Sequence, residues 1–174
     1  MRFDLELSIA QLERMPSVLD PWLRGADAAW TRSHSGPESW SAFDVVGHLI
    51  HGERTDWMPR LRIILEDGEA RPFDEFDRFA QQAENANRSL GSLLDHFSEL
   101  RASNLRELRE LQLTPEDLAR TGTHPTFGRV TASELLATWT AHDLAHLSQI
   151  ARTQLWQYRE AMGPWRQFFS SLAE

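Results

Sequence analysis

Apolar residues recur at helical spacing near the start of the chain. The steps between them are three, four or seven residues, as expected for a helix that buries one face. Pro16 lies inside this run, and proline cannot donate a backbone hydrogen bond. The pattern therefore predicts either a kink at Pro16 or a break followed by a short second helix. The apolar positions that define the run are Leu5, Ile9, Leu12, Leu19 and Leu23.

Two longer helices are expected in the middle of the chain. Residues 25–40 are rich in small and polar side chains and predict a loop. Ser41 and Asp44 have the spacing of a capping box and begin a helix that reaches about Asp67. A further apolar stripe predicts a helix from about Asp74 to Leu111, which at 1.5 Å per residue would be about 55 Å long.

The last third of the chain predicts one more long helix. Residues 114–117 indicate a short helical turn, and residues 121–130 are interpreted as a loop. The capping box Thr131-Ala-Ser-Glu134 opens a helix that reaches about Ala161, and residues 165–172 predict a short terminal helix. No long stretch alternates apolar and polar residues as a strand would. The expected fold is all-α: a four-helix bundle over residues 1–174, up-and-down or crossover, with short extra helices in the third connection and at the C-terminus.

Composition narrows the classes of protein that this bundle can belong to. The chain has 174 residues, of which 41% are hydrophobic and 25% charged, as in ordinary globular proteins. The net charge is −8, every basic residue is arginine and no arginine cluster stands out, so nucleic acid is not an expected partner. We found neither a signal-like region nor an apolar run of about 18–20 residues, so we expect a cytoplasmic protein without membrane contact.

The chain contains no cysteine, so a metal ion would have to bind to His, Asp or Glu. His142 and His146 are four residues apart, which places both rings on one face of a helix, about one turn from each other. They share the core-facing stripe with Trp139 and Ile150. Two inward histidines indicate either a metal site or core histidines that hydrogen bond to other helices.

A third ligand is expected from another helix that faces the same interior. His48 and His51 both lie on the second helix. On a helical wheel, the mean direction of the apolar residues of that helix lies roughly 130° from His48 and roughly 170° from His51. The pattern favours His48 and predicts that His51 points outward. His34, His96 and His124 are interpreted as surface residues.

Two segments together resemble a known family. The first is Trp40-Ser-Ala-Phe-Asp-Val-Val-Gly-His48-Leu-Ile-His-Gly-Glu53-Arg54, and the second is Trp139-Thr-Ala-His142-Asp-Leu-Ala-His146-Leu-Ser-Gln149-Ile150. Their order and spacing resemble the DinB-like superfamily, which includes the YfiT-type metal-dependent hydrolases. The resemblance extends over essentially the whole chain.

The resemblance implies a four-helix bundle in which His48, His142 and His146 hold one divalent cation. It implies nickel or zinc first, with manganese or iron as alternatives, and a homodimer. Characterised relatives include thiol S-transferases, so a low-molecular-weight thiol is an expected co-substrate beside a small-molecule substrate. Three imidazoles would leave a coordination position open, as in catalytic zinc sites.

Several residues near the histidines are candidates for further roles. Glu53 and Asp143 are candidate general bases, and Asp44 lies one turn before His48. Gln149 can hydrogen bond across the bundle. Aromatic residues on a helix stripe more often pack in a core than line a pocket, and this favours a core position for Trp139. Arg54 could bind a substrate anion, but a surface ion pair is the more common role.

Other metal and hydrolase motifs fit less well. No glutamate precedes a histidine by three residues, which excludes the di-iron bundles, and position 143 holds Asp where the zincin motif has Glu. No aspartate follows Asp143, as an HD phosphohydrolase pattern would require. Two hypotheses remain. The first is a metal-dependent enzyme that activates water or a thiol, and the second is a non-catalytic, metal-stabilised bundle that serves as a dimerisation or partner-binding module.

Overall fold

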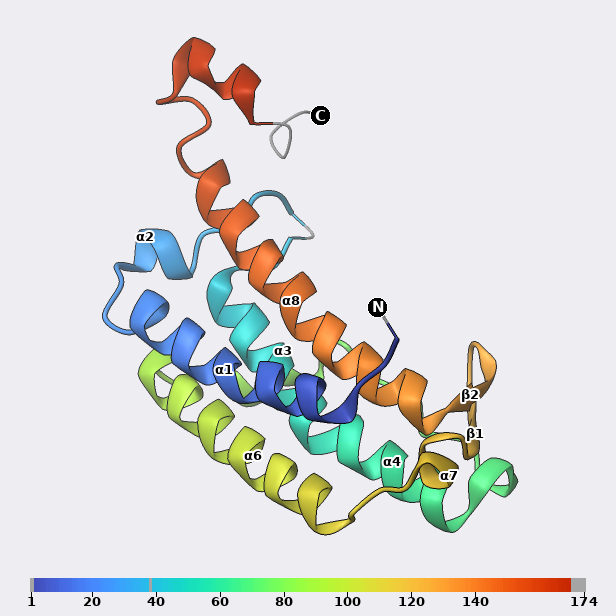
Figure 1. Cartoon of the computed structure of the whole chain (residues 1–174). Coiled ribbons are helices and arrows are strands. Elements are labelled where there is room, and N and C mark those ends of the chain that lie inside the picture. The colour runs from blue at the N-terminus through green and yellow to red at the C-terminus, as the bar shows by residue number, and fades with distance from the viewer. Residues whose placement is uncertain (1, 38, 170–174) are drawn as a thin grey trace.

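The computed structural model describes residues 2–37 and 39–169. Within them, four long helical segments lie side by side: α1 (Leu5–Leu23), α3 (Ala42–Thr55) continued by α4 (Trp57–Glu66), α6 (Leu90–Glu110) and α8 (Ala132–Trp156) (Figure 1). Both α1 and α3 pack against α6 and α8. The order around the bundle is therefore α1, α6, α3, α8, so the chain crosses the bundle between α1 and α3. The expected helical bundle is confirmed.

The helix boundaries differ from the sequence prediction where proline or tertiary packing intervenes. The helix α1 continues through Pro16, so of the two predicted alternatives, a kink or a break, the break does not occur. The helix expected to reach Asp67 is interrupted at Asp56, and α4 begins at Trp57. Proline at position 59 explains this interruption, because its ring has no N–H to donate and would collide with the carbonyl four residues earlier in a continuous helix.

The helix predicted from Asp74 to Leu111 is shorter than expected. Residues 73–79 form no helix, a short α5 (Ala80–Asn85) follows, and α6 begins only after Ser89. The Ser89 hydroxyl accepts a hydrogen bond from the Ser92 amide at 3.1 Å and so caps α6. The last long helix ends at Trp156 rather than near Ala161.

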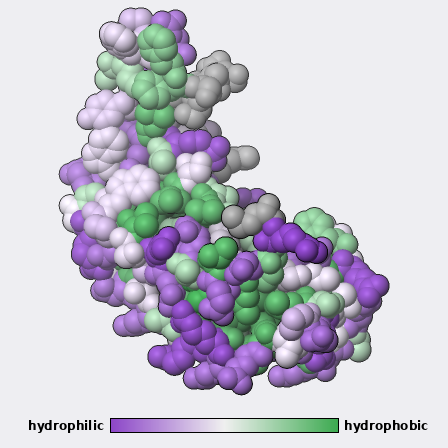
Figure 2. Space-filling model, in the orientation of Figure 1, coloured by the Kyte–Doolittle hydropathy of each residue, from purple (hydrophilic) through white to green (hydrophobic). Residues whose placement is uncertain are grey.

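Short elements fill the connections. They are α2 (Ala28–Thr31), η1 (Gly68–Ala70), α7 (Pro115–Leu118) in the third connection and η2 (Gly163–Phe168) near the C-terminus. The predicted terminal helix lies outside the described residues from position 170 onward. The segment after α8 extends away from the bundle (Figure 1), and Figure 2 shows apolar side chains on it. None of the described helices combines the length and apolarity needed to cross a membrane.

The segment predicted as a loop at residues 121–130 instead contains an antiparallel hairpin, β1 (Thr121–His124) and β2 (Gly128–Thr131). The strands are too short and too polar for an alternating pattern. Gly122 lies so close to Ile64 and Phe73 that a Cβ there would stand 2.8 Å from Ile64 Cγ1 and 2.9 Å from Phe73 Cε1. Contact with the bundle therefore fixes the hairpin.

Two apolar clusters fill the bundle, one on each side of a polar layer. On α8, Trp139 belongs to one cluster and Ile150 to the other. The candidate histidines of α8 lie between these two positions. On α6, the buried Arg101 lies between Phe97 of one cluster and Leu105 of the other. The polar layer thus crosses the middle of the bundle and contains the candidate site.

Candidate metal centre

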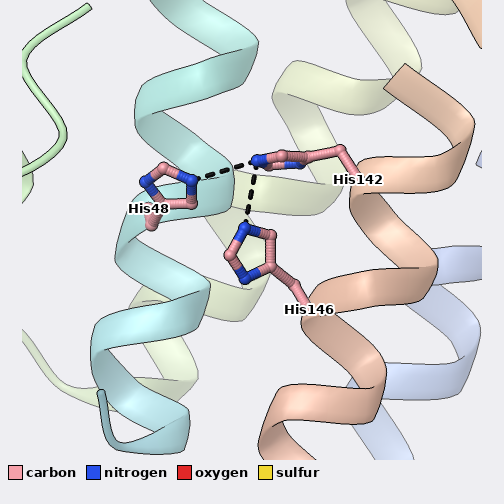
Figure 3. A group of neighbouring side chains, drawn as sticks. All are labelled: His48, His142 and His146. Atoms are coloured by element: carbon pink, nitrogen blue, oxygen red, sulfur yellow. Dashed lines mark hydrogen bonds between the residues drawn. The ribbon is translucent and has the colours of Figure 1, made fainter. Parts of the chain in front are cut away.

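Three histidine rings meet in this layer. His48 comes from α3, and His142 and His146 come from successive turns of α8 (Figure 3). His142 Nε2 lies 3.0 Å from His48 Nε2 and 3.0 Å from His146 Nε2. One ring nitrogen of each histidine lies within 4.8 Å of the others, so the three residues could hold a metal ion.

Hydrogen bonds alone do not account for this arrangement. A ring nitrogen either carries one proton or offers one lone pair. His142 Nε2 therefore cannot form two well-directed bonds to His48 and His146 at once. Four-coordinate zinc with Zn–N bonds of about 2.0–2.1 Å separates neighbouring ligand nitrogens by about 3.3 Å. The observed separations of 3.0 Å are close to that value, so the donor set fits a shared cation.

The surroundings keep these rings uncharged. Burial, reinforced by the neighbouring histidines, lowers the pKa of His48 to about 3 and that of His142 to about 2. Burial also lowers the pKa of His146. At neutral pH the three imidazoles are therefore neutral, which is the form that binds metal ions.

Aromatic side chains surround the histidines. The Trp40 ring lies 4.6 Å from the His48 ring and stacks on His146 at 6.1 Å, between ring centroids. Trp57 contacts His142 at 5.1 Å, and Phe76 contacts His48 at 5.5 Å. Such apolar surroundings limit the access of water and strengthen electrostatic interactions with a bound cation.

The Nδ1 atoms, which point away from the other histidines, have different contacts in the three rings. His146 Nδ1 lies 2.7 Å from Gln149 Oε1, on the same helix rather than across the bundle as expected. This contact fixes the orientation of the His146 ring and leaves its Nε2 free to point at the other histidines. The Nδ1 atoms of His48 and His142 are buried without a partner among the described residues.

The two candidate general bases lie against an arginine. Glu53 and Asp143 are both buried and form ion pairs with Arg101 of α6, at 2.8 and 2.6 Å. Asp143 follows His142 in the chain, but its side chain is only 2% exposed and lies against Arg101. A role as general base stays a prediction for both residues, and the geometry favours a structural role.

Further hydrogen bonds complete this buried ion network. Arg101 Nη1 donates to the carbonyl of Leu12 at 2.9 Å, and Trp139 Nε1 donates to Glu53 Oε1 at 2.9 Å. Asn104 Nδ2 donates to Glu53 Oε2 at 2.9 Å. The network therefore joins all four sides of the bundle directly beside the histidines.

Arg101 was not among the site residues predicted from the sequence, although its position carries a signal. Arg101 lies four residues after Phe97 and four before Leu105, in the middle of the apolar stripe of α6. A charged residue at a core position indicates buried partners. The predicted core position of Trp139 is confirmed, since the ring is fully buried and stacks on Trp57 at 5.9 Å.

The remaining candidates lie in other places. Asp44 accepts hydrogen bonds in the capping box of α3, and Arg54 forms an exposed ion pair with Glu84 at 2.6 Å. The prediction that His51 points outward was wrong. His51 is 7% exposed because Phe76, from the non-helical segment, covers it at 4.9 Å between ring centroids. The helical pattern of α3 alone could not predict this contact, because Phe76 comes from a distant segment of the chain.

Comparisons with known proteins agree with the fold and the motif. The model of the DinB superfamily matches residues 11–150. The structure is similar to that of YfiT from Bacillus subtilis, described as a probable metal-dependent hydrolase with an unusual four-helix bundle topology. The TM-score is 0.74 at 20% identity, over 90% of this chain and 87% of that chain. No curated protein matches the sequence.

Proposed function

Since the chain belongs to the DinB superfamily, we propose that it is a metal-dependent hydrolase that holds one divalent cation on His48, His142 and His146. The observation that carries this proposal is the convergence of three neutral imidazoles on one point, with Nε2 separations of 3.0 Å that hydrogen bonds alone do not satisfy. Imidazole ligands suit zinc and nickel best, with iron and manganese as alternatives. The similarity to YfiT supports the proposal.

The chain's own residues supply binding and orientation. The histidines offer three lone pairs and leave a coordination position for a substrate or water. A bound divalent cation would act as a Lewis acid and lower the pKa of water or of a thiol toward neutrality. Trp40, Trp57 and the buried Arg101 network hold α3 and α8 at the spacing that brings the rings together.

Transfer of a small-molecule thiol is the second candidate reaction. Over the described residues, no carboxylate belongs to the histidine cluster, and Glu53 and Asp143 contact Arg101 instead. A thiol has a pKa near 8.5, far below that of water, and therefore needs less help from a general base. The chain has no cysteine, so such a thiol would come from a co-substrate.

Metal analysis of the purified protein tests the site. We expect about one divalent ion per chain in the wild type, and loss of that ion in the His48→Ala and His142→Gln variants. The matched control is His96→Ala, which removes a histidine of α6 outside the cluster. Saturating metal should raise the melting temperature of the wild type and the control, because a ligand of the folded state stabilises it.

Three outcomes separate the alternatives. A folded apo protein that regains activity in hydrolase or thiol-transfer screens when reloaded supports an enzyme. A protein that unfolds on chelation and stays inactive when reloaded supports the metal-stabilised, non-catalytic bundle. A wild type that takes up no ion after reconstitution refutes the metal site, and with it the proposed reaction.

We also propose that the protein forms a homodimer. The segment after α8 carries Trp165 and Phe168, which are 69% and 70% exposed, and such apolar surface is typical of protein contacts. Sedimentation of the full chain tests this, and a monomer at micromolar concentration would refute it.

A further inference from the structure

A cavity of about 580 Å³ reaches His142 from one side of the bundle. This volume lies within the range of small-molecule sites. Four aromatic rings line it, from α4, the 73–76 segment and the hairpin turn: Trp57, Phe73, Phe76 and Phe127. Phe127 is 77% exposed and stacks on His124 at 4.6 Å between ring centroids. Phe127 therefore extends the aromatic lining of the cavity to the protein surface.

The charged residues of the cavity are predominantly acidic. Three carboxylates line it, those of Asp56, Glu75 and Glu134, against the single guanidinium of Arg60. Arg60 Nε lies 2.5 Å from Asp56 Oδ1, so its charge is already paired. Glu134 is held by the hydrogen bonds of the capping box at the start of α8.

The other three titratable residues of the cavity, Glu75, His124 and the neutral His142, add no positive charge. Glu75 is exposed and forms no ion pair or hydrogen bond within residues 2–37 and 39–169. Burial and the charge of Arg60 lower the pKa of His124 below 6.5, so its ring is neutral at neutral pH. A ligand in the cavity therefore meets aromatic faces and carboxyl groups that outnumber the guanidinium three to one. Aromatic faces attract cations, and carboxylates do so as well.

We propose that this cavity is the specificity site of the enzyme and that it binds an amine with an aromatic or apolar body, whose ammonium group faces Glu75 and Phe127. The inference rests on the proposed function only in placing the reacting group of such a substrate near His142. The binding preference itself belongs to the cavity and does not require the metal ion.

Three probes of similar size and shape test the preference on the full chain. They are 2-phenylethylamine, 2-phenylethanol and 3-phenylpropanoate, titrated into the metal-free protein at pH 7 and low salt. Binding is followed by NMR chemical shifts, with the indole of Trp57, which lines the cavity, as the reporter. We expect the amine to bind most tightly and the carboxylate most weakly, and added salt to weaken the amine.

Two variants and two controls locate the binding. Glu75→Gln and Phe127→Ala should each weaken the amine by about threefold, as expected for one exposed ion pair or one cation–π contact. The controls Glu99→Gln on α6 and Leu7→Ala on α1 change exposed acidic and apolar side chains outside the cavity and should leave the affinity unchanged. All four positions are exposed, so each variant should fold.

The outcomes distinguish this inference from the proposed function. If 3-phenylpropanoate binds at least as tightly as the amine, or if both cavity variants bind the amine like the wild type, the proposed preference is refuted while the metal site is unaffected. If the amine preference is found and metal analysis finds no ion, the cavity assignment stands and the proposed reaction fails.

Discussion

Replacement of Arg101 by methionine should cost the protein a large part of its stability. The side chains of Arg101, Glu53 and Asp143 are 1%, 0% and 2% exposed, so water cannot replace the lost contacts. The variant would leave two carboxylates and the Leu12 carbonyl without the guanidinium that now donates to all three. Removal of one partner from a buried ion pair costs about 3–5 kcal/mol.

The matched control is the same substitution on the same helix. Arg109 forms an ion pair with Glu13 at 2.6 Å, but the two side chains are 45% and 49% exposed. Exposed pairs contribute about 0–1 kcal/mol, so Arg109→Met should change the free energy of unfolding little. Urea denaturation, followed by tryptophan fluorescence and circular dichroism, measures both variants. For a chain of this size, the Arg101 variant should also melt about 10 °C lower.

A combined variant separates charge from packing. Glu53→Gln and Asp143→Asn, added to Arg101→Met, replace the unpaired carboxylates with neutral amides. An unsatisfied amide costs less than an unpaired buried charge, so part of the lost stability should return. Equal losses for Arg101→Met and Arg109→Met would refute the argument that the buried ion network stabilises the bundle. No recovery in the combined variant would refute the electrostatic explanation.

Three further predictions concern single contacts. Trp139→Phe keeps an aromatic ring at this position but removes the hydrogen-bond donor to Glu53 Oε1. It should lower the free energy of unfolding, measured by urea denaturation, by about 1–3 kcal/mol. An unchanged urea midpoint would contradict this. Gly122→Ala places a Cβ 2.9 Å from a Phe73 ring atom and should cost about 1–3 kcal/mol, with the hairpin amides losing protection from hydrogen exchange. Hydrogen bonds from Thr131 at the start of α8 lower the pKa of Glu134. The Glu134 carboxylate therefore stabilises the folded state above its unfolded pKa of about 4.5. This stabilisation is lost as the pH falls below that value. Glu134→Ala should therefore be less stable than the wild type at pH 7, and the difference should shrink below pH 4.5; a constant difference would exclude the charge as its cause.

The accurate parts of the sequence prediction depend on residues close together in the chain. The capping boxes that begin α3 and α8 are present as predicted, because each joins a hydroxyl and a carboxylate three residues apart. The same local geometry places His142 and His146 on one face of α8, since four residues make about one helical turn.

The inaccurate parts depend on contacts between distant segments. The hairpin at residues 121–131 has almost no pattern of its own, and its position depends on contact with Phe73 and the end of α4. His51 is buried because Phe76 leaves the helix that the sequence predicted for it. Each outcome depends on packing energy that no single helix pattern contains.

The sequence by itself determined the helical bundle, the starts of α3 and α8 and the pair of histidines one turn apart, because hydrophobic periodicity and capping act over a few residues. The pattern of α3 also favoured His48, which the structure places beside that pair. The tertiary structure alone decided that Glu53 and Asp143 bind Arg101, 48 and 42 residues away in the chain. It also formed the acidic, aromatic cavity beside His142. Burial of a charge and the meeting of three rings depend on how helices pack, and packing brings together residues that the chain keeps far apart.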